Sequence, residues 1–153
     1  MSLEHPILGI DHGEARVGLA ITDAAGIIAY PVATVVNDES LFTSIVSEFN
    51  ARQAKSIIIG IPLLADGSEG KAALKIRKFK NELVKQIGSH VPVEFVDEAG
   101  TTIAASAKLR SAGKKSHTQK DMIDQAAAVE ILNHYMNSQD NPYGLLEDPD
   151  AMF

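Results

Sequence analysis

Apolar runs of strand length divide the first hundred residues of the chain. Runs at 7–11, 16–22 and about 29–36 are separated by short turns that contain glycine, which predicts three antiparallel strands in a meander. The run at 56–61 is apolar at almost every position, which is typical of a central strand buried on both faces. A shorter run at 93–96 predicts a fifth strand.

Apolar residues at helical spacing indicate helices between and after these strands. The predicted helices cover residues 41–53, 72–87, a short segment from Thr101 or Thr102 to about Ser111, and 120–137, with a polar basic loop at 113–119. This order of elements predicts an α/β fold. We expect a mixed five-stranded sheet, with an antiparallel three-strand meander plus two parallel strands, flanked by helices.

Length and composition fit one globular domain. The chain has 153 residues, of which 45% are hydrophobic, and this is enough for a substantial core. We assign the domain to residues 6–137 and predict an acidic, flexible tail at 138–153. No apolar run is long enough to cross a bilayer, and the absence of cysteine agrees with a reducing cytoplasm.

The formal net charge of -6 is unusual for a protein that binds nucleic acid. Four of the acidic residues lie within 140–153, however, so the rest of the chain carries 16 acids against 14 bases. Two segments, 71–85 and 108–120, are rich in Lys and Arg. Each is either a solvated surface or a surface that contacts phosphate.

Acidic residues follow the first and the fifth predicted strands. Asp11 ends the first strand, and Gly13 would let a phosphate or a cation approach the backbone closely, although Asp and Gly are also common in turns. Asp97 and Glu98 follow the fifth strand, and only one of these neighbours can point inward. Acids at this place would also favour the start of a following helix. Because ligands gather at the carboxyl ends of strands, both acidic sites should open onto one edge of the sheet.

A third acid lies in the last predicted helix. Asp124 shares a helical stripe with Ala127, Ala128 and Ile131, which otherwise indicates core. A first-turn Asp favoured by the helix dipole is the alternative interpretation. The small residues beside it would let the helix approach the sheet and bring Asp124 to Asp11, and Asp121 is a reserve ligand.

Three carboxylates around one or two Mg²⁺ or Mn²⁺ ions would form a site of hard oxygen ligands. Such a site could activate water for the hydrolysis of a phosphodiester. The five histidines show no zinc-ligand spacing. His12, next to Asp11, is either a bystander or a proton shuttle.

These motifs resemble those of the YqgF/RuvX family of RNase H-like nucleases over about residues 6–137. The resemblance rests on Ile-Leu-Gly-Ile-Asp-x-Gly-x-x-Arg-Val-Gly-Leu-Ala-x-x-Asp at 7–23, Gly60-x-Pro62 with Asp66-Gly67-Ser68, Asp97-Glu98 with Thr101-Thr102, and Asp124-x-Ala126-Ala127. It implies that Asp11, Glu98 and Asp124 are the catalytic, metal-binding carboxylates, with Asp97 as a substitute for Glu98.

The sequence departs from the family pattern at two places. Ala99-Gly100 stand where the family has Arg and an apolar residue, and His12 replaces a small or β-branched residue. The missing Arg removes a phosphate or structural contact, which Arg16 or a Lys114-Lys115 loop could replace. The expected substrate contacts are Gly13, Arg16, Thr101, Thr102, Lys114 and Lys115.

The resemblance implies a metal-dependent endonuclease that processes the 5′ end of pre-16S rRNA during ribosome biogenesis, as a monomer or weak homodimer. One alternative is a Holliday junction resolvase acting on four-way DNA, which needs a two-fold dimer for paired cuts. A second is a catalytically weakened, ribosome-associated RNA-binding module. An actin-like ATPase would need two such domains to enclose ATP, and the chain has room for one.

Overall fold

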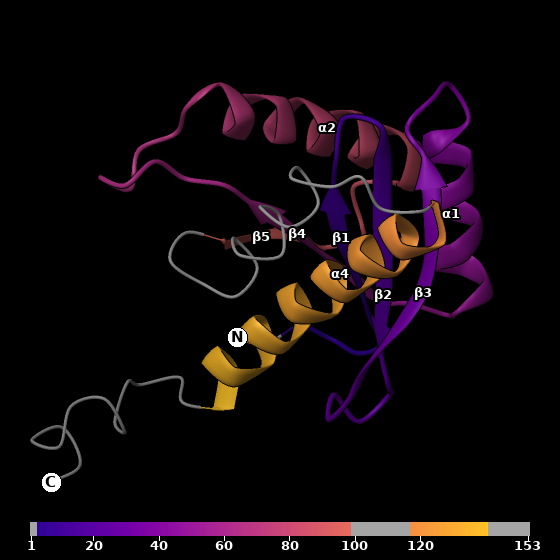
Figure 1. Ribbon diagram of the computed structural model, residues 1–153. Coiled ribbons are helices and arrows are strands. Elements are labelled where there is room, and N and C mark those ends of the chain that lie inside the picture. Colours follow the sequence, from indigo (N-terminus) through magenta and orange to yellow (C-terminus); the bar gives the residue numbers. More distant parts are fainter. Residues whose placement is uncertain (1–2, 99–116, 141–153) are drawn as a thin grey trace, which may run out of the picture.

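A computed structural model describes residues 3–98 and 117–140, and its strands form one mixed sheet (Figure 1). The strands are β1 (Ile7–His12), β2 (Arg16–Thr22), β3 (Ala29–Val36), β4 (Ser56–Ile61) and β5 (Val93–Asp97), in the order β3-β2-β1-β4-β5. The first three strands pair antiparallel, whereas β4 runs parallel to β1 and β5 parallel to β4. The predicted fold class is therefore confirmed.

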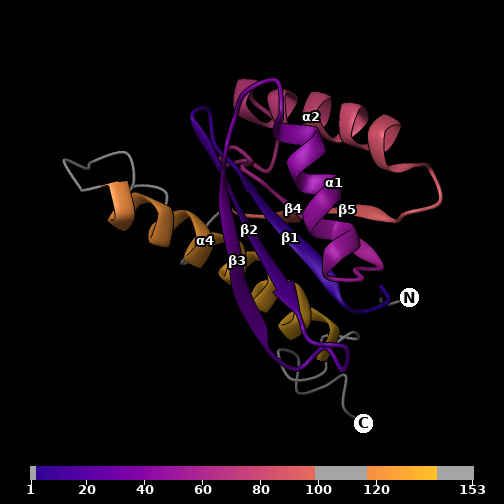
Figure 2. The same cartoon turned by 90° about the vertical axis from the view of Figure 1, so that its right-hand side faces the viewer.

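Helices cover both faces of the sheet. Helices α1 (Leu41–Ala51) and α2 (Lys71–Ile87) lie on one face, and α4 (His117–Asp140) crosses the other (Figure 2). Figure 1 shows α4 running diagonally over the strands. The predicted short helix at 101–111 and residues 141–153 of the predicted tail lie outside the described residues.

Two helices begin or end at residues that differ from those predicted from the sequence. Helix α1 stops at Ala51 instead of 53, because Gln53 adopts a left-handed conformation with φ of 55°. Helix α4 starts at His117 and ends at Asp140, so it includes part of the predicted basic loop and the first residues of the predicted tail. The additional residues are polar, and they therefore carry no apolar periodicity that would reveal a helix.

Alternation along the strands creates two apolar layers. Leu8 and Ile10 of β1 pack into the cluster that includes Ile45 of α1 and Phe79 of α2. The intervening positions face the cluster formed with Ala128, Ile131 and Leu132 of α4. All six residues of β4 are buried, which confirms its predicted place as a central strand.

Glycines allow α4 to lie very close to the sheet. A Cβ atom at Gly9 would come within 2.5 Å of the Leu132 side chain, and one at Gly18 would overlap the backbone oxygen of Asp124. Ala127 and Ala128 are fully buried at this contact. The small residues thus bring Asp124 over β2, next to the strand position that pairs with Asp11.

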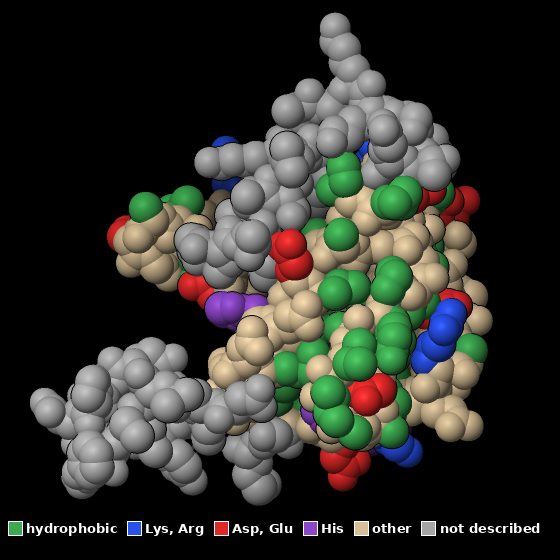
Figure 3. Space-filling model, turned by 60° about the horizontal axis from the view of Figure 1, so that its bottom comes forward, with side chains coloured by type: hydrophobic (Ala, Val, Ile, Leu, Met, Phe, Trp, Pro, Cys, Tyr) green, Lys and Arg blue, Asp and Glu red, His purple; other side chains and the backbone are tan. Residues whose placement is uncertain are grey.

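Hydrophobic side chains gather on the face shown in Figure 3, where few Lys or Arg are visible. Exposed apolar residues in the described ranges include Ile27, Ile28, Tyr30 and Met122. Within those ranges, no helix has both the length and the hydropathy needed to span a membrane.

Candidate active site

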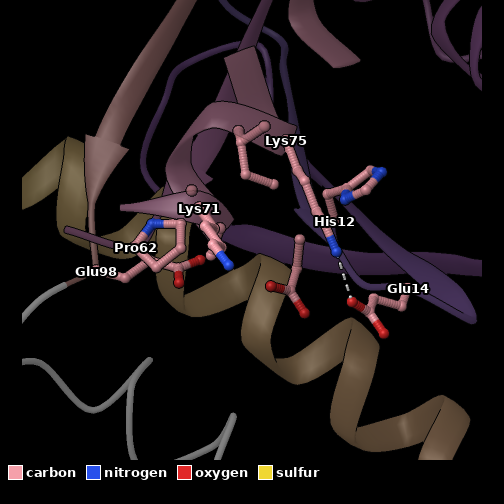
Figure 4. Close-up of a pocket in the computed structure, with 10 residues that line it drawn as sticks. His12, Glu14, Pro62, Lys71, Lys75 and Glu98 are labelled. Carbon is pink, nitrogen blue, oxygen red and sulfur yellow. Dashed lines mark hydrogen bonds and ion pairs between the residues drawn. The ribbon is translucent and has the colours of Figure 1, made fainter. Parts of the chain in front are cut away.

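The carboxyl ends of β1, β4 and β5 surround a pocket of about 470 Å³ (Figure 4). Asp11 is the last residue but one of β1 and is almost fully buried, and Glu98 follows β5 directly. The pocket is lined by Asp11, His12, Glu14, Gly60, Pro62, Lys71, Ala72, Lys75, Ile76 and Glu98. Two of the three predicted carboxylates therefore share one cavity, at the edge of the sheet where a ligand site was expected.

The pleat of β5 distinguishes Glu98 from Asp97. Val96 faces the α4 layer and Phe95 packs on the opposite layer, so Glu98 returns to the α4 side. Its backbone N–H extends the ladder by donating to the Ile61 carbonyl at 3.0 Å. Asp97 is exposed and does not line the pocket.

Gly60 makes room for the Glu98 carboxylate. A Cβ atom at this position of β4 would overlap the Glu98 Oε1 and would lie 2.6 Å from Ile131 Cδ1. Any larger residue would displace the carboxylate or α4. The glycine in the middle of an otherwise apolar strand is thus explained by the position of the acid.

Asp124 is buried on α4 and ion-paired with Arg16. The Arg16 Nε donates to the Asp124 Oδ2 at 2.7 Å, and the two side chains are 23% and 3% exposed. The helix starts seven residues before Asp124, so the interpretation of this residue as a first-turn acid is wrong. Asp124 is not among the residues that line the pocket, and neither is Asp121, whose carbonyl accepts a hydrogen bond from Thr34 Oγ1 at 2.8 Å.

Carboxylate oxygens are suitable ligands for Mg²⁺ or Mn²⁺. Asp11 and Glu98 offer them in the shared pocket, while Asp124 lies at the same end of the sheet and is bound to Arg16. Over residues 3–98 and 117–140, no three Asp, Glu or His side chains come together closely enough to hold a metal ion. The donor chemistry fits a divalent cation, with two of the expected ligands already in one cavity.

His12 points away from the carboxylates. Its ring packs on Phe79 of α2 with centroids 4.5 Å apart, as expected for the strand position next to Asp11. Burial lowers the pKa of His12 most strongly. A backbone hydrogen bond raises it by less, and the positive charge of Lys75 lowers it slightly further. The neutral ring is therefore favoured, and its contact with Phe79 joins the His12 side chain to α2.

Gly13 forms the tight turn between β1 and β2. Its N–H donates to the Arg16 carbonyl at 3.0 Å, and its own carbonyl accepts from Asn37 Nδ2 at 2.8 Å. A Cβ atom there would come within 2.5 Å of the Arg16 carbonyl oxygen. The turn alone accounts for a glycine at this position.

Two lysines of α2 were not among the predicted site residues. Lys71 and Lys75 line the pocket, and Lys75 Nζ lies 2.9 Å from Glu14 Oε1 (Figure 4). The hydrogen bond from Lys75 and its charge lower the pKa of Glu14. The sequence shows that segment 71–85 is basic, but it does not show which side of the helix faces the pocket.

The other predicted substrate contacts Thr101, Thr102, Lys114 and Lys115 lie outside the described residues.

Comparison with curated proteins identifies close relatives. A "Putative pre-16S rRNA nuclease" of Kineococcus radiotolerans is 41% identical over 135 residues, which cover 86% of this chain and 71% of the relative. A protein of the same name from Chloroflexus aggregans is 36% identical over 142 residues, which cover 92% of this chain and 99% of the relative.

Solved structures of resolvases have the same fold. RuvC of T. thermophilus in complex with a Holliday junction substrate matches with a TM-score of 0.55 and 12% identity, over 88% of this chain and 96% of RuvC. Fowlpox virus resolvase in complex with Holliday junction DNA matches with a TM-score of 0.50 and 13% identity, over 88% and 99% of the two chains. At such identities the likeness confirms the RNase H-like fold alone. Residues 5–138 also match the model of the RuvX family, described as Holliday junction resolvase, and the chain therefore belongs to the RuvX family.

Proposed function

We propose that this chain is a metal-dependent endonuclease that hydrolyses phosphodiester bonds at the 5′ end of the 16S rRNA precursor. The observation that supports this function best is the pocket in which Asp11 and Glu98 meet, in a chain of the RuvX family. The names of the curated relatives favour RNA as the substrate. A substrate of this kind implies a cytoplasmic location.

Asp11 and Glu98 would hold Mg²⁺ or Mn²⁺ through their carboxylate oxygens. A bound ion supplies an activated water and stabilises the leaving oxygen in an in-line displacement. Asp124 of α4 would contribute a further carboxylate oxygen. Its negative charge is now balanced by Arg16, and a bound cation would take the place of the arginine.

Asp97 is a weaker candidate because it is exposed and outside the pocket. Asp121 is weaker than Asp124 because it lies about one turn earlier on α4, whereas Asp124 lies against Gly18, the residue that pairs with Asp11.

Gly13, Arg16, Thr101, Thr102, Lys114 and Lys115 are the proposed substrate contacts. For Arg16 the ion pair with Asp124 suggests a second role, because a guanidinium in this place offsets the cost of burying the carboxylate. Arg16 would thus hold Asp124 in position beside the catalytic edge of the sheet.

A four-way DNA junction is the second candidate substrate. The description of the RuvX family and the two junction-bound resolvases of the same fold favour it. Paired cuts across a junction require a two-fold dimer. Sedimentation that finds only monomer at the enzyme concentration of a cleavage assay would count against this substrate.

Cleavage of an RNA that carries the immature 5′ end of 16S rRNA tests the proposed function. In the presence of Mn²⁺, Asp11→Asn and Glu98→Gln should each lower the rate about a hundredfold or more, because a metal ligand contributes several kcal/mol to the barrier. Asp97→Asn is the matched control, since this neighbouring acid is exposed and outside the pocket. An Asp11→Asn protein that cleaves as fast as the unmodified enzyme would refute the site.

A further inference from the structure

Exposed lysines of α2 form a stripe that begins at the pocket. Lys71 and Lys75 line the cavity, and Lys78 follows one turn later on the same side of the helix. With a rise of about 1.5 Å per residue, the three side chains originate about 6 Å and about 4.5 Å apart along the helix axis. The stripe thus leads from the carboxylates along the surface of α2.

The rotation of α2 is fixed by its buried side. Ala73, Ile76, Phe79 and Leu83 are all buried in the core, and they hold the lysine stripe toward solvent. Among the described residues, in contrast, few basic side chains are visible in the view of Figure 3. The exposed side of α2 therefore carries Lys71, Lys75 and Lys78 beside the pocket, although the net charge of the chain is negative.

Other basic residues of α2 are engaged on a different side of the helix. Arg77 is ion-paired with Glu69 and lies over the Phe95 ring, with 5.1 Å between the guanidinium carbon and the ring centroid. The Lys80 Nζ lies 4.9 Å from the same centroid. Arg77 and Lys80 thus lie over the edge strand β5. The stripe of Lys71, Lys75 and Lys78 instead faces solvent beside the pocket.

We propose that Lys71, Lys75 and Lys78 bind successive phosphates of the substrate strand as it leaves the active site. This inference rests on the proposed function and adds the path of the strand. Lys75 is held by Glu14, whose side chain is 87% exposed, so a phosphate would compete with a carboxylate that can turn into solvent. Recognition of this kind depends on the backbone charge and is independent of base sequence.

Salt-dependent binding tests the stripe. The probe is a fluorescein-labelled single-stranded RNA, and anisotropy is measured over a series of salt concentrations with the Asp11→Asn protein, which keeps the RNA intact. Lys71→Gln and Lys75→Gln should each weaken binding several-fold and lower the slope of log K against log salt by about 0.7. Glu14→Gln should act in the opposite direction, because it removes the competitor for Lys75.

Lys55→Gln is the matched control. Lys55 is exposed and precedes β4, at the end of that strand opposite the pocket, so its loss should leave the slope unchanged. If Lys71→Gln and Lys75→Gln bind RNA with the slope of Lys55→Gln, the proposed path is wrong. Melting temperatures within about a degree of the parent protein would show that each variant is folded.

Two further results separate this inference from the proposed function. Equal losses of affinity with RNA and with a DNA strand of the same length support phosphate contact, and a loss confined to RNA would overturn it. Cleavage by the unmodified enzyme is measured in parallel. An enzyme that binds RNA through the lysines without cleaving it would contradict the proposed function and leave the stripe established, whereas an enzyme that binds no RNA at low salt would contradict the stripe.

Discussion

Arg16 and Asp124 form an ion pair that joins β2 to α4 beside the candidate site. The carboxylate is 3% exposed and accepts from the Arg16 Nε at 2.7 Å. Removing one partner of a buried ion pair leaves an uncompensated charge, which is far more costly than the pair is stabilising.

Arg16→Gln should lower the free energy of unfolding by about 2 kcal/mol, less than for a fully buried pair because the arginine is partly exposed. Urea denaturation measures the change. Lys85→Gln is a suitable comparison, since the contact of Lys85 with Glu82 is long, at 3.7 Å, and both side chains are exposed. Equal losses of unfolding free energy in the two variants would mean that the Arg16 ion pair stabilises the fold no more than an exposed pair does.

At the scale of elements, the position of α4 is determined by small residues in the strands beneath it. Gly18 leaves space for the backbone of Asp124, and Gly60 leaves space for Glu98 and Ile131. Both glycines lie in strands, where they cost conformational entropy and contribute no packing. Close approach of the helix to the sheet explains why they are present.

Gly18→Ala should displace α4 and move Asp124 away from the catalytic edge. The added methyl group would overlap backbone atoms, which cannot turn aside as a side chain can. We expect a loss of about 1–3 kcal/mol in stability, as for other overpacked sites, and a fall in cleavage rate. In the control Gly70→Ala, the new Cβ meets only the end of the Leu64 side chain at 3.1 Å. A Gly18→Ala enzyme with unchanged stability and activity would disprove this tight contact.

At the scale of the whole molecule, the sheet separates two apolar layers, and the candidate site lies at one end of its strands. Helices α1 and α2 with their apolar cluster hold one face, and α4 holds the other. Asp11, Glu98 and Asp124 all lie at one end of the strands. Repulsion between their negative charges there destabilises the folded chain. A cation that binds there should stabilise the folded chain.

Mg²⁺ or Mn²⁺ should therefore raise the melting temperature of the enzyme. Binding to the folded state alone stabilises by about 1.4 kcal/mol for each tenfold excess of ion over its dissociation constant. Asp11→Asn should lose most of this rise, and Asp97→Asn should keep it. Thermal melts at constant ionic strength measure the effect, and an equal rise in Asp11→Asn would place the ion elsewhere.

The sequence determined most of the fold by itself. Each strand could be predicted to within about a residue, because alternating and continuous apolar runs report burial directly. The ends of α4 were missed, since polar residues at the ends of a helix carry no such pattern. The carboxylates at the strand ends were also predictable, because the edge on which ligands gather follows from the order of the elements.

Only the tertiary structure decided which side chains meet. The pleat turned Glu98 toward α4 and left Asp97 exposed, and the packing of α4 on Gly18 set Asp124 against Arg16. The lysines of α2 came to the pocket because their helix buries its opposite side. Such pairings join residues that are far apart in the chain. They depend on the rotation and distance of packed elements, and local sequence patterns specify neither.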